Sequence, residues 1–290
     1  MSTPAAKTWT VLELLRWTTQ HFIERGIETP RLDAECLLAF ALDCDRLRLY
    51  VDHDKPLDDG ERARFRELVR ERAQARVPVA LLTGTREFWS LLLQVTRDVL
   101  VPRPETETLV AAALDAFPDR EAELRALDVG TGSGAIALAL ARERSKARVT
   151  ASDVSAPALA VAARNAEALG VADRVRFLEG PLFEPVCGES FELVVSNPPY
   201  LAEREAETLA PELRHEPASA LFAGPDGTDV LRAFAAQVRD VLAPGGVALV
   251  ELDPRQAELV AGWLSAAGLA EITTHRDAAG RVRVLSARRG

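Results

Sequence analysis

The chain has 290 residues, of which 48% are hydrophobic and 27% charged, a composition typical of a soluble globular protein with one large or two ordinary domains. Its apolar runs are too short to span a bilayer and its first residues lack a signal peptide's apolar core, which predicts a cytoplasmic protein without a membrane partner. The net charge of −9 argues weakly against a protein that holds DNA by its phosphates, so no DNA partner is expected.

Residues 1–85 are predicted to form a small helical domain. Thr10 and Glu13 have the spacing of a capping box, in which each side chain bonds the other residue's backbone N–H. Thr29-Pro30 opens a second helix with proline in its first turn, and Asp58 or Asp59 can cap a third. Because three short amphipathic helices bury little apolar area alone, we expect an accessory domain.

The third expected helix contains an arginine-rich segment, residues 62–76, in which six arginines stand against Glu67 and Glu71. One interpretation is a solvated helix face, and the other is a contact for a charged macromolecule. Both interpretations stay open at this point.

Residues 86–101 are predicted to form a β-hairpin linker whose turn lies at Arg97-Asp98. From residue 102 to 290 the pattern alternates strand and helix, which predicts a mostly parallel sheet with helices on both faces. The expected strands are residues 126–129, 148–152, 175–178, 191–196 and 246–252, with weaker ones near 272 and at 282–286. The expected helices are residues 105–116, 135–142, 156–169, 229–242 and 256–267.

A glycine-rich turn follows the first strand of this sheet, at the edge where doubly wound sheets bind their ligands. It begins with Asp128 and contains Gly130, Gly132 and Gly134, which allow a tight turn and a close ligand approach. The G-x-G-x-G spacing and the acidic residue favour S-adenosylmethionine over a dinucleotide cofactor. The acid would repel a pyrophosphate, whereas it suits the ammonium and the sulfonium of S-adenosylmethionine. Asp153, about 20 residues on, is placed either for ribose hydroxyls or for capping the next helix. Because NAD enzymes share such an acid, NAD stays open as a ligand.

The tetrapeptide Asn197-Pro198-Pro199-Tyr200 follows the fourth strand, at the same edge. A carboxamide or ring amino nitrogen is a poor nucleophile because its lone pair is delocalised. The Asn197 side-chain oxygen and the Pro198 carbonyl can accept both of its N–H groups and hold the nitrogen towards a methyl donor. The prolines stiffen the turn, and Tyr200 offers a face for stacking, so Asn197, Pro198 and Tyr200 are the predicted catalytic residues. An ordinary proline turn is the alternative, but it does not require the whole tetrapeptide.

These motifs make the chain resemble the glutamine N5-methyltransferases of the HemK/PrmC type, and the likeness covers almost the whole chain. Other matching segments are residues 30–35, 83–89, 102–107, 214–217 and 223–227. The resemblance implies a class I (Rossmann-like) methyltransferase domain at residues 102–290, preceded by a helical substrate-recognition domain and the hairpin. It also implies an enzyme that uses S-adenosylmethionine to methylate the glutamine of the Gly-Gly-Gln motif in class-1 peptide chain release factors.

The resemblance also implies roles for single residues. The implied cofactor contacts are Asp128, Gly130, Thr131, Gly132, Ser133, Gly134, Asp153, Leu182 and Asn197. The implied contacts of the acceptor glutamine are Asn197, Pro198, Pro199 and Tyr200. The chain departs from the family pattern at Pro181, where an acid is usual near the adenine, and at Asp253, where glycine is usual. No His or Cys residues have metal-ligand spacing, so no bound metal is expected.

Two other functions stay open. The same tetrapeptide serves nucleic-acid methyltransferases that act on adenine N6 or guanine N2 of a flipped base, although the acidic balance and the lack of an evident target-recognition domain argue against this. The second is a binding module without catalysis, which the intact Asn197 and Tyr200 argue against. Because a glutamine carboxamide offers few atoms to recognise, residues 1–85 are expected to contact the protein substrate around it.

Overall fold

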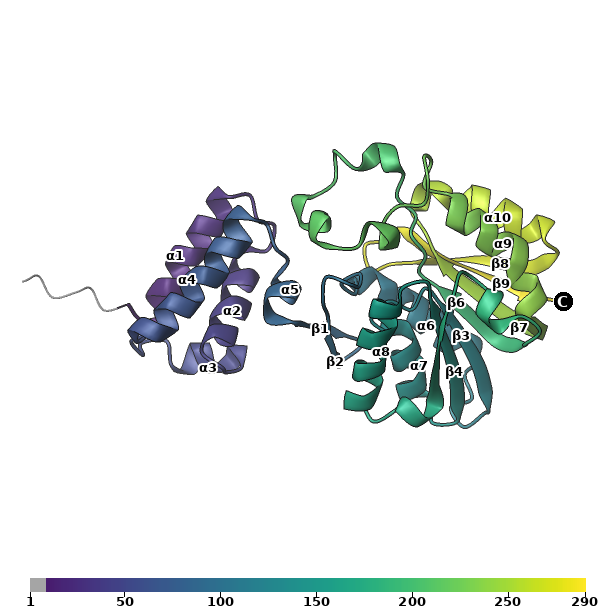
Figure 1. Cartoon of the computed structure of the whole chain (residues 1–290), viewed down its shortest axis with the longest axis horizontal. Helices are drawn as coiled ribbons and strands as arrows, with labels where there is room; N and C mark the ends of the chain where they lie inside the picture. The colour runs from purple at the N-terminus through teal and green to yellow at the C-terminus, as the bar shows by residue number, and fades with distance from the viewer. Residues whose placement is uncertain (1–8) are drawn as a thin grey trace, which may run out of the picture. The chain divides into compact units, whose positions relative to one another are not determined.

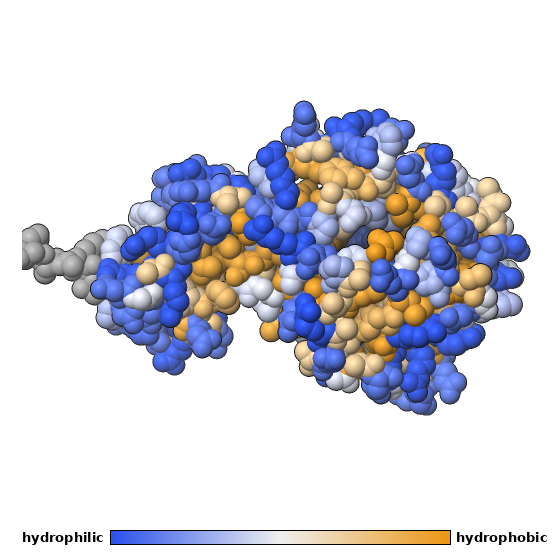
Figure 2. Space-filling view, in the orientation of Figure 1, coloured by the Kyte–Doolittle hydropathy of each residue, from blue (hydrophilic) through white to orange (hydrophobic). Residues whose placement is uncertain are grey.

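The computed structural model describes residues 9–290, which form two compact units that divide between Gly84 and Thr85 (Figure 1). Each unit has its own hydrophobic core, and hydrophilic side chains cover most of the face shown in Figure 2. Within residues 9–290, no helix combines the length and the apolarity needed to cross a membrane.

The helices of residues 9–84 are α1 (Val11–Glu24), α2 (Pro30–Ala41), α3 (Arg46–Val51), α4 (Asp59–Gln74) and α5 (Val79–Thr83). Thr10 and Glu13 form the expected capping box, Pro30 is the first residue of α2, and Asp58 caps α4. The short helices α3 and α5 were not predicted, because neither is long enough to show a helical period.

Two acidic residues of α2 hold this helical unit together. Asp33 and Arg72 form a buried ion pair, with 2.7 Å between Arg72 Nε and the carboxylate. Glu35 is also buried and accepts hydrogen bonds from Arg31 and Tyr50. Removing one partner of a buried ion pair costs about 3–5 kcal/mol, because it leaves the other charge uncompensated. Arg72, one of the six arginines of the arginine-rich segment, is therefore structural. It belongs neither to a solvated helix face nor to a contact for a charged macromolecule.

The expected hairpin is present as β1 (Thr85–Phe88) and β2 (Leu91–Gln94), but the prediction of its turn was wrong. The turn lies at Trp89 and Ser90, whose positive φ angles of 51° and 57° suit a two-residue hairpin turn. Neither residue is a glycine or asparagine, so the usual signal for such a turn is missing. Arg97-Asp98, which carries a stronger turn signal, lies in the loop beyond β2.

Seven strands of the second unit form one sheet in the order β5-β4-β3-β6-β7-β9-β8 (Figure 1). The strands from β5 to β7 are parallel, and β9 and β8 are antiparallel, which confirms the expected mostly parallel sheet. Their bounds are β3 (Leu124–Val129), β4 (Ala147–Asp153), β5 (Val175–Glu179), β6 (Phe191–Ser196), β7 (Leu242–Glu251), β8 (Leu269–Arg276) and β9 (Val282–Arg289).

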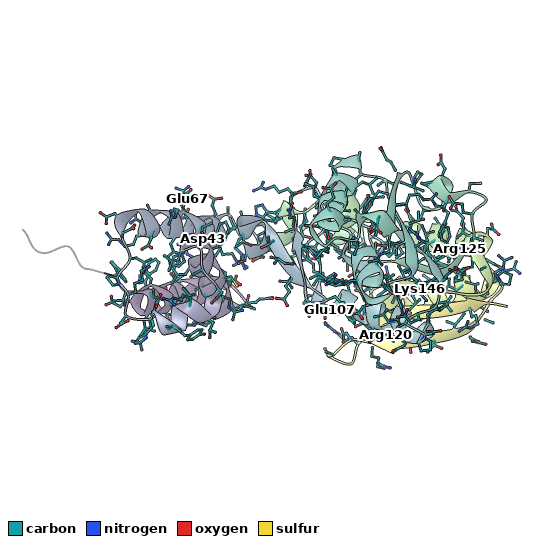
Figure 3. The ribbon with its side chains drawn as sticks, turned by 90° about the horizontal axis from the view of Figure 1, so that it is seen from below. Asp43, Glu67, Glu107, Arg120, Arg125 and Lys146 are labelled. Carbon is teal, nitrogen blue, oxygen red and sulfur yellow. The ribbon has the colours of Figure 1, made fainter. Side chains whose placement is uncertain are left out.

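Helices cover both faces of this sheet. They are α6 (Glu107–Ala116), α7 (Ala135–Glu143), α8 (Ala156–Ala168), α9 (Asp229–Val241) and α10 (Ala257–Ala266). Ala126 of β3 packs in the core formed with α6, α7 and α8, whereas the next residue, Leu127, packs with α9 and α10, because side chains alternate along a strand. Glu107, labelled in Figure 3, accepts a hydrogen bond from the Trp89 N–H over 2.8 Å and fastens the hairpin to α6.

The order of the strands brings four strand ends together at one edge. Val129 of β3 pairs with Ser152 of β4 and Ser196 of β6, and Ser196 pairs with Val250 of β7. This edge lies where the chain order reverses between β3 and β6, the place where such sheets bind ligands. The polar or glycine residues that meet there are Gly130, Asp153, Asn197 and Glu251.

Candidate active site

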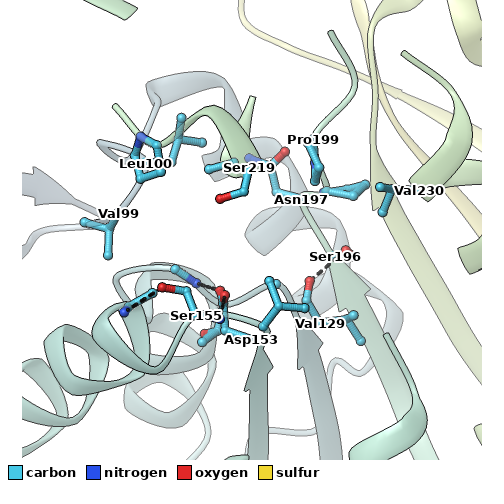
Figure 4. Close-up of a pocket in the computed structure, with 18 of the residues that line it drawn as sticks. Val99, Leu100, Val129, Asp153, Ser155, Ser196, Asn197, Pro199, Ser219 and Val230 are labelled. Atoms are coloured by element: carbon cyan, nitrogen blue, oxygen red, sulfur yellow. Dashed lines mark hydrogen bonds between the residues drawn. The ribbon is translucent and has the colours of Figure 1, made fainter. Parts of the chain in front are cut away.

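A cavity of about 420 Å³ lies at this edge of the sheet, within the size range of small-molecule sites (Figure 4). Its walls come from the ends of β3, β4 and β6, the loop after β5, and segments within residues 98–106 and 217–220. The predicted site residues that line it are Gly130, Thr131, Gly132, Ser133, Asp153, Leu182, Asn197, Pro198 and Pro199. Asp128, Gly134 and Tyr200 do not line it.

The loop after β3 takes its shape from its glycines. Gly130 and Gly134 have φ angles of 75° and 85°, in the left-handed region that residues with a Cβ rarely adopt. A Cβ on Gly134 would also lie 3.0 Å from Leu138 of α7 and 3.2 Å from Ala162 of α8. Gly134 therefore shapes the site by letting these two helices pack closely beneath the loop.

Asp128 supports the same loop from inside the protein. It is fully buried, and its Oδ2 atom accepts hydrogen bonds from the Thr131 hydroxyl at 2.7 Å and the Ala137 N–H at 3.1 Å. Its Oδ1 atom has no partner in residues 9–290. Burial is the main cause that raises the pKa of Asp128 to about 7, and the nearby charge of Asp153 adds to the rise. These bonds tie Asp128 to the geometry of the loop, and a direct cofactor contact stays a prediction.

Asp153 ends β4 and faces the cavity (Figure 4). Its two oxygens accept the N–H groups of Gly132 at 2.8 Å and Ser155 at 2.9 Å. Burial raises the pKa of Asp153, although both N–H groups act against the rise. Asp153 was also considered as the N-cap of α8. The N-cap is instead Ser155, whose hydroxyl accepts the Ala158 N–H. Because each carboxylate oxygen can accept about two hydrogen bonds, Asp153 can still bind ligand hydroxyls.

Asn197 is held at one end of its side-chain amide. Its Nδ2 atom donates to the Thr106 hydroxyl over 3.1 Å, across 91 positions of the sequence. Its Oδ1 atom accepts no hydrogen bond from residues 9–290 and is available to a ligand. Ser196, the preceding residue, donates from its hydroxyl to the Val129 carbonyl over 2.7 Å and so anchors the end of β6 to β3. The tetrapeptide therefore presents a hydrogen-bond acceptor at the cavity wall.

Tyr200 lies differently from the other residues of the tetrapeptide. Its ring packs against the hydrophobic core on the α9 and α10 side of the sheet, and its hydroxyl lies 3.5 Å from Glu251 Oε1. Burial, followed by the negative charge of Glu251, raises the pKa of Tyr200 above its usual value, so the hydroxyl stays protonated. Stacking of Tyr200 on an acceptor stays a prediction.

Two buried polar residues that contact the tetrapeptide, Thr106 at Asn197 and Glu251 at Tyr200, were not predicted as site residues. Thr106 lines the cavity, and Glu251, at the end of β7, is 1% exposed. Burial raises the pKa of Glu251 to about 7, against the opposing effects of a hydrogen bond from Thr106 and the charge of Arg283. The sequence signal that could have identified Glu251 as a site residue was an acidic residue at the end of the strand that pairs with β6.

Glu216 joins two walls of the cavity. Its buried carboxylate accepts the Val101 N–H over 3.0 Å and pairs with the Arg103 guanidinium. Arg103 and the neighbouring Pro217 both line the cavity. The matching segments at residues 102–107 and 214–217 therefore have a shared structural role, which is to close this side of the site.

Comparisons with known proteins agree with this arrangement. A model described as "PrmC N-terminal domain" matches residues 13–84, and one described as "Methyltransferase small domain" matches residues 107–236. A release factor glutamine methyltransferase from Rhodopirellula baltica is 43% identical over 288 residues, covering 96% of this chain and 96% of that protein. Another from Geobacter sulfurreducens is 43% identical over 289 residues, covering 99% and 100%. This chain belongs to the release factor glutamine methyltransferase family.

Membership of the release factor glutamine methyltransferase family confirms the predicted family, and the chain is therefore a methyltransferase. The fold is also that of a methyltransferase from Pyrococcus furiosus, with a TM-score of 0.51 and 20% identity, covering 68% of this chain and 88% of that one. Within residues 9–290, no three His, Cys, Asp or Glu side chains are grouped to hold a metal ion.

Proposed function

We propose that this protein transfers a methyl group from S-adenosylmethionine to the side-chain amide nitrogen (N5) of the glutamine in the Gly-Gly-Gln motif of class-1 peptide chain release factors. The names of its relatives support this substrate. The observation that carries the chemistry is the Asn197 amide, whose nitrogen is held by Thr106 while its oxygen is available at the cavity wall. A substrate from the translation machinery also agrees with the expected cytoplasmic location.

The residues of the cavity fit S-adenosylmethionine by their chemistry. Asp153 can accept ribose hydroxyls, and Val154 and Leu182 offer apolar contacts for an adenine. Asp128 has an unpartnered oxygen behind the glycine-rich loop, and in its ionised form it would place negative charge near a cationic ligand. When bound, this cofactor supplies an electrophilic methyl group on its sulfonium.

The acceptor requires positioning more than it requires a base. A carboxamide nitrogen is a weak nucleophile because its lone pair is delocalised into the carbonyl. The Asn197 oxygen and the Pro198 carbonyl would each accept one of its N–H groups, which orients the nitrogen and favours loss of conjugation. Pro198 and Pro199 keep this turn stiff and bring no competing N–H. The methylated nitrogen is acidic and loses its extra proton to water.

We also assign recognition of the release factor to the helical unit. A groove of about 470 Å³ lies between α1 and α4, and Trp17, which is 51% exposed, stacks on His21 within it. Three arginines of α4 line the groove: Arg62, Arg66 and Arg70. Among the described residues, the lining of the groove contains no acidic side chain. Because aromatic and guanidinium groups are enriched in protein interfaces, this groove suits a partner protein with acidic side chains.

The direct test is incubation of the protein with S-adenosylmethionine and an intact class-1 release factor, followed by mass spectrometry. We expect one added methyl group on the Gly-Gly-Gln glutamine, and none when that glutamine is replaced by alanine. DNA and RNA, incubated in parallel with labelled cofactor, test the adenine and guanine alternatives. Methylation confined to nucleic acid would overturn the proposal, and cofactor binding without methyl transfer to any acceptor would indicate a binding module.

A further inference from the structure

A buried glutamine joins two segments that lead to the cavity wall. Gln256 is 9% exposed and ends the short 3-10 helix between β7 and α10. Its side-chain Nε2 atom donates to the Tyr200 carbonyl over 3.0 Å and to the Gly227 carbonyl over 2.8 Å. Tyr200 ends the tetrapeptide, and Gly227 lies just before α9. One side-chain amide therefore connects three separate parts of the sequence.

The neighbours of Gln256 fix the orientation of its amide. Its Oε1 atom accepts the Asp253 N–H over 3.2 Å, in a capping box at the start of the 3-10 helix. The two groups at the other end are backbone carbonyls, which can only accept, so the NH₂ group must face them. That NH₂ group has two N–H donors for the two carbonyls. Because none of these groups titrates, the arrangement does not depend on pH.

Gly227 lies in direct contact with the end of the tetrapeptide. Its φ angle is 71°, in the left-handed region that favours glycine. A Cβ at this position would lie 2.5 Å from the Tyr200 carbonyl oxygen and 2.7 Å from the Ala202 nitrogen, closer than such atoms approach. Residues 201–226 leave the sheet and return between these two points, and they carry Ser219 at the cavity wall (Figure 4). The glutamine amide therefore closes the neck of a loop that forms part of the site.

The tetrapeptide is held on both sides. Before its first residue, Ser196 pairs with β3 and donates from its hydroxyl to the Val129 carbonyl over 2.7 Å. At its last residue, the Tyr200 carbonyl accepts from Gln256. Between these points the rings of its two prolines hold φ at about −65°. A short segment with both ends held and few free torsions keeps its carbonyls in one direction, and the Pro198 carbonyl is one of them.

We propose that Gln256 is a positioning residue, which acts through the Tyr200 carbonyl to keep the Pro198 carbonyl directed at the methyl-acceptor nitrogen. This inference rests on the proposed function, in which the Pro198 carbonyl accepts an N–H group of the acceptor. Without the glutamine amide, both carbonyls at the neck of the loop lose their donor, and the end of the tetrapeptide is free to turn. The acceptor nitrogen then loses a fixed partner and lies less often in line with the methyl donor.

Single-turnover kinetics at saturating cofactor and acceptor test this positioning role. Gln256→Leu removes the amide at a similar side-chain size and should slow methyl transfer roughly 10- to 100-fold, because misplacing a reacting group by about 1 Å can cost about 10²-fold. The affinity for S-adenosylhomocysteine, measured by calorimetry, should not change, since Gln256 does not line the cavity.

Gln256→Glu separates positioning from helix capping. A glutamate can also accept the Asp253 N–H in the capping box, but its ionised carboxylate has no N–H for the two carbonyls. We therefore expect this variant to slow methyl transfer at least as much as Gln256→Leu does. A residue that served only as a cap would keep the wild-type rate when replaced by glutamate.

Two further variants complete the test. Gly227→Ala pushes against the Tyr200 carbonyl from the other side, so its loss of rate should add little to that of Gln256→Leu. Gln237→Leu is the matched control, because Gln237 is exposed on α9 and donates to the Ala233 carbonyl of the same helix; it should leave the rate unchanged.

A wild-type rate for Gln256→Glu, or a loss of S-adenosylhomocysteine affinity as large as the loss of rate, would overturn the positioning role. If Gln256→Glu does not fold, the coupling of Gln256→Leu with Gly227→Ala decides it, and fully additive losses would overturn the role.

The wild-type reaction separates this inference from the proposed function. Methylation of the release factor glutamine by the wild type tests the function. The ratios of variant to wild-type rates test the positioning role on whichever acceptor the wild type methylates. A wild type active only on nucleic acid would overturn the function, and the rate of Gln256→Glu on that acceptor would still decide the positioning role.

Discussion

The Asp153 carboxylate accepts the Gly132 N–H over 2.8 Å, so the residue that ends β4 also holds the glycine-rich loop that follows β3. Asp153→Ala should therefore weaken binding of S-adenosylhomocysteine by roughly 10- to 100-fold, since hydrogen bonds to a charged group contribute about 1.5–3 kcal/mol each. Asp153→Asn retains one acceptor oxygen and should lose less. Isothermal calorimetry measures both affinities, and we expect no binding of NAD to the wild type.

Thermal melts of the same two variants separate lost ligand contacts from a collapsed loop. Wild-type affinity in a folded Asp153→Ala variant would contradict the cofactor role. Tight NAD binding without a response to S-adenosylhomocysteine would contradict the choice of cofactor.

Asn197→Ala should reduce kcat by roughly 10²–10³, as when one positioned hydrogen-bond partner is removed from a reacting group. The affinity for S-adenosylhomocysteine should change little, because the side-chain nitrogen of Asn197 bonds to Thr106 and its oxygen is assigned to the acceptor. Steady-state kinetics on an intact release factor measure kcat, and calorimetry measures the affinity. Near wild-type turnover would rule out the assigned role.

Glu251→Gln should make the stability of the protein less dependent on pH. Burial raises the pKa of Glu251 from 4.5 to about 7, so between these pH values the folded state holds a proton that the unfolded state has released. The free energy of unfolding therefore falls as pH rises through this window, and the contribution is lost above about pH 7. The glutamine variant has no such group. Its melting temperature minus that of the wild type should therefore be larger at about pH 8 than at about pH 5.

Calorimetric melts of both proteins at the two pH values check this expectation. The melting temperature of a domain of this size shifts by roughly 2–4 °C for each kcal/mol. Asp128 also has a pKa raised to about 7, but it is present in both proteins and its effect cancels. The same difference in melting temperature at both pH values would show that Glu251 does not titrate in this window.

Arg66→Glu should raise KM for an intact release factor while leaving KM for a short Gly-Gly-Gln peptide unchanged. Arg66 is exposed at the groove between α1 and α4, whereas Arg62 and Arg70 are paired with acidic neighbours on α4. Reversing one charge at the rim of an interface typically changes binding by roughly two- to tenfold, and the effect weakens with salt. Kinetics on both substrates at two salt concentrations measure it.

Arg142→Glu is the matched control, because Arg142 is an exposed arginine on α7 of the other unit. It should leave both KM values unchanged. Equal KM values for wild type and Arg66→Glu on the intact release factor would remove the groove from the recognition surface.

The sequence by itself determined the sheet, its long helices and the two motifs that line the cavity after β3 and β6. Capping at Thr10 and Asp58, the turn after β3 and the tetrapeptide after β6 all depend on residues within a few positions of each other. Such features are visible in a linear pattern because short-range hydrogen bonds and backbone angles produce them. The alternation of strands and helices then placed Asp153 and Asn197 at one edge, because the carboxyl ends of parallel strands meet there.

Only the tertiary structure decided where the side chains of that edge point and what supports them. Asp128 turns into the protein to hold its loop, and Tyr200 reaches Glu251 rather than the cavity wall. Thr106 meets Asn197 across 91 positions of the sequence. Local pattern cannot reveal such contacts, because they depend on which strands pair and on which helix covers their ends. Burial then completes the site, since the pKa of Glu251 rises only when folding removes water from around its carboxylate.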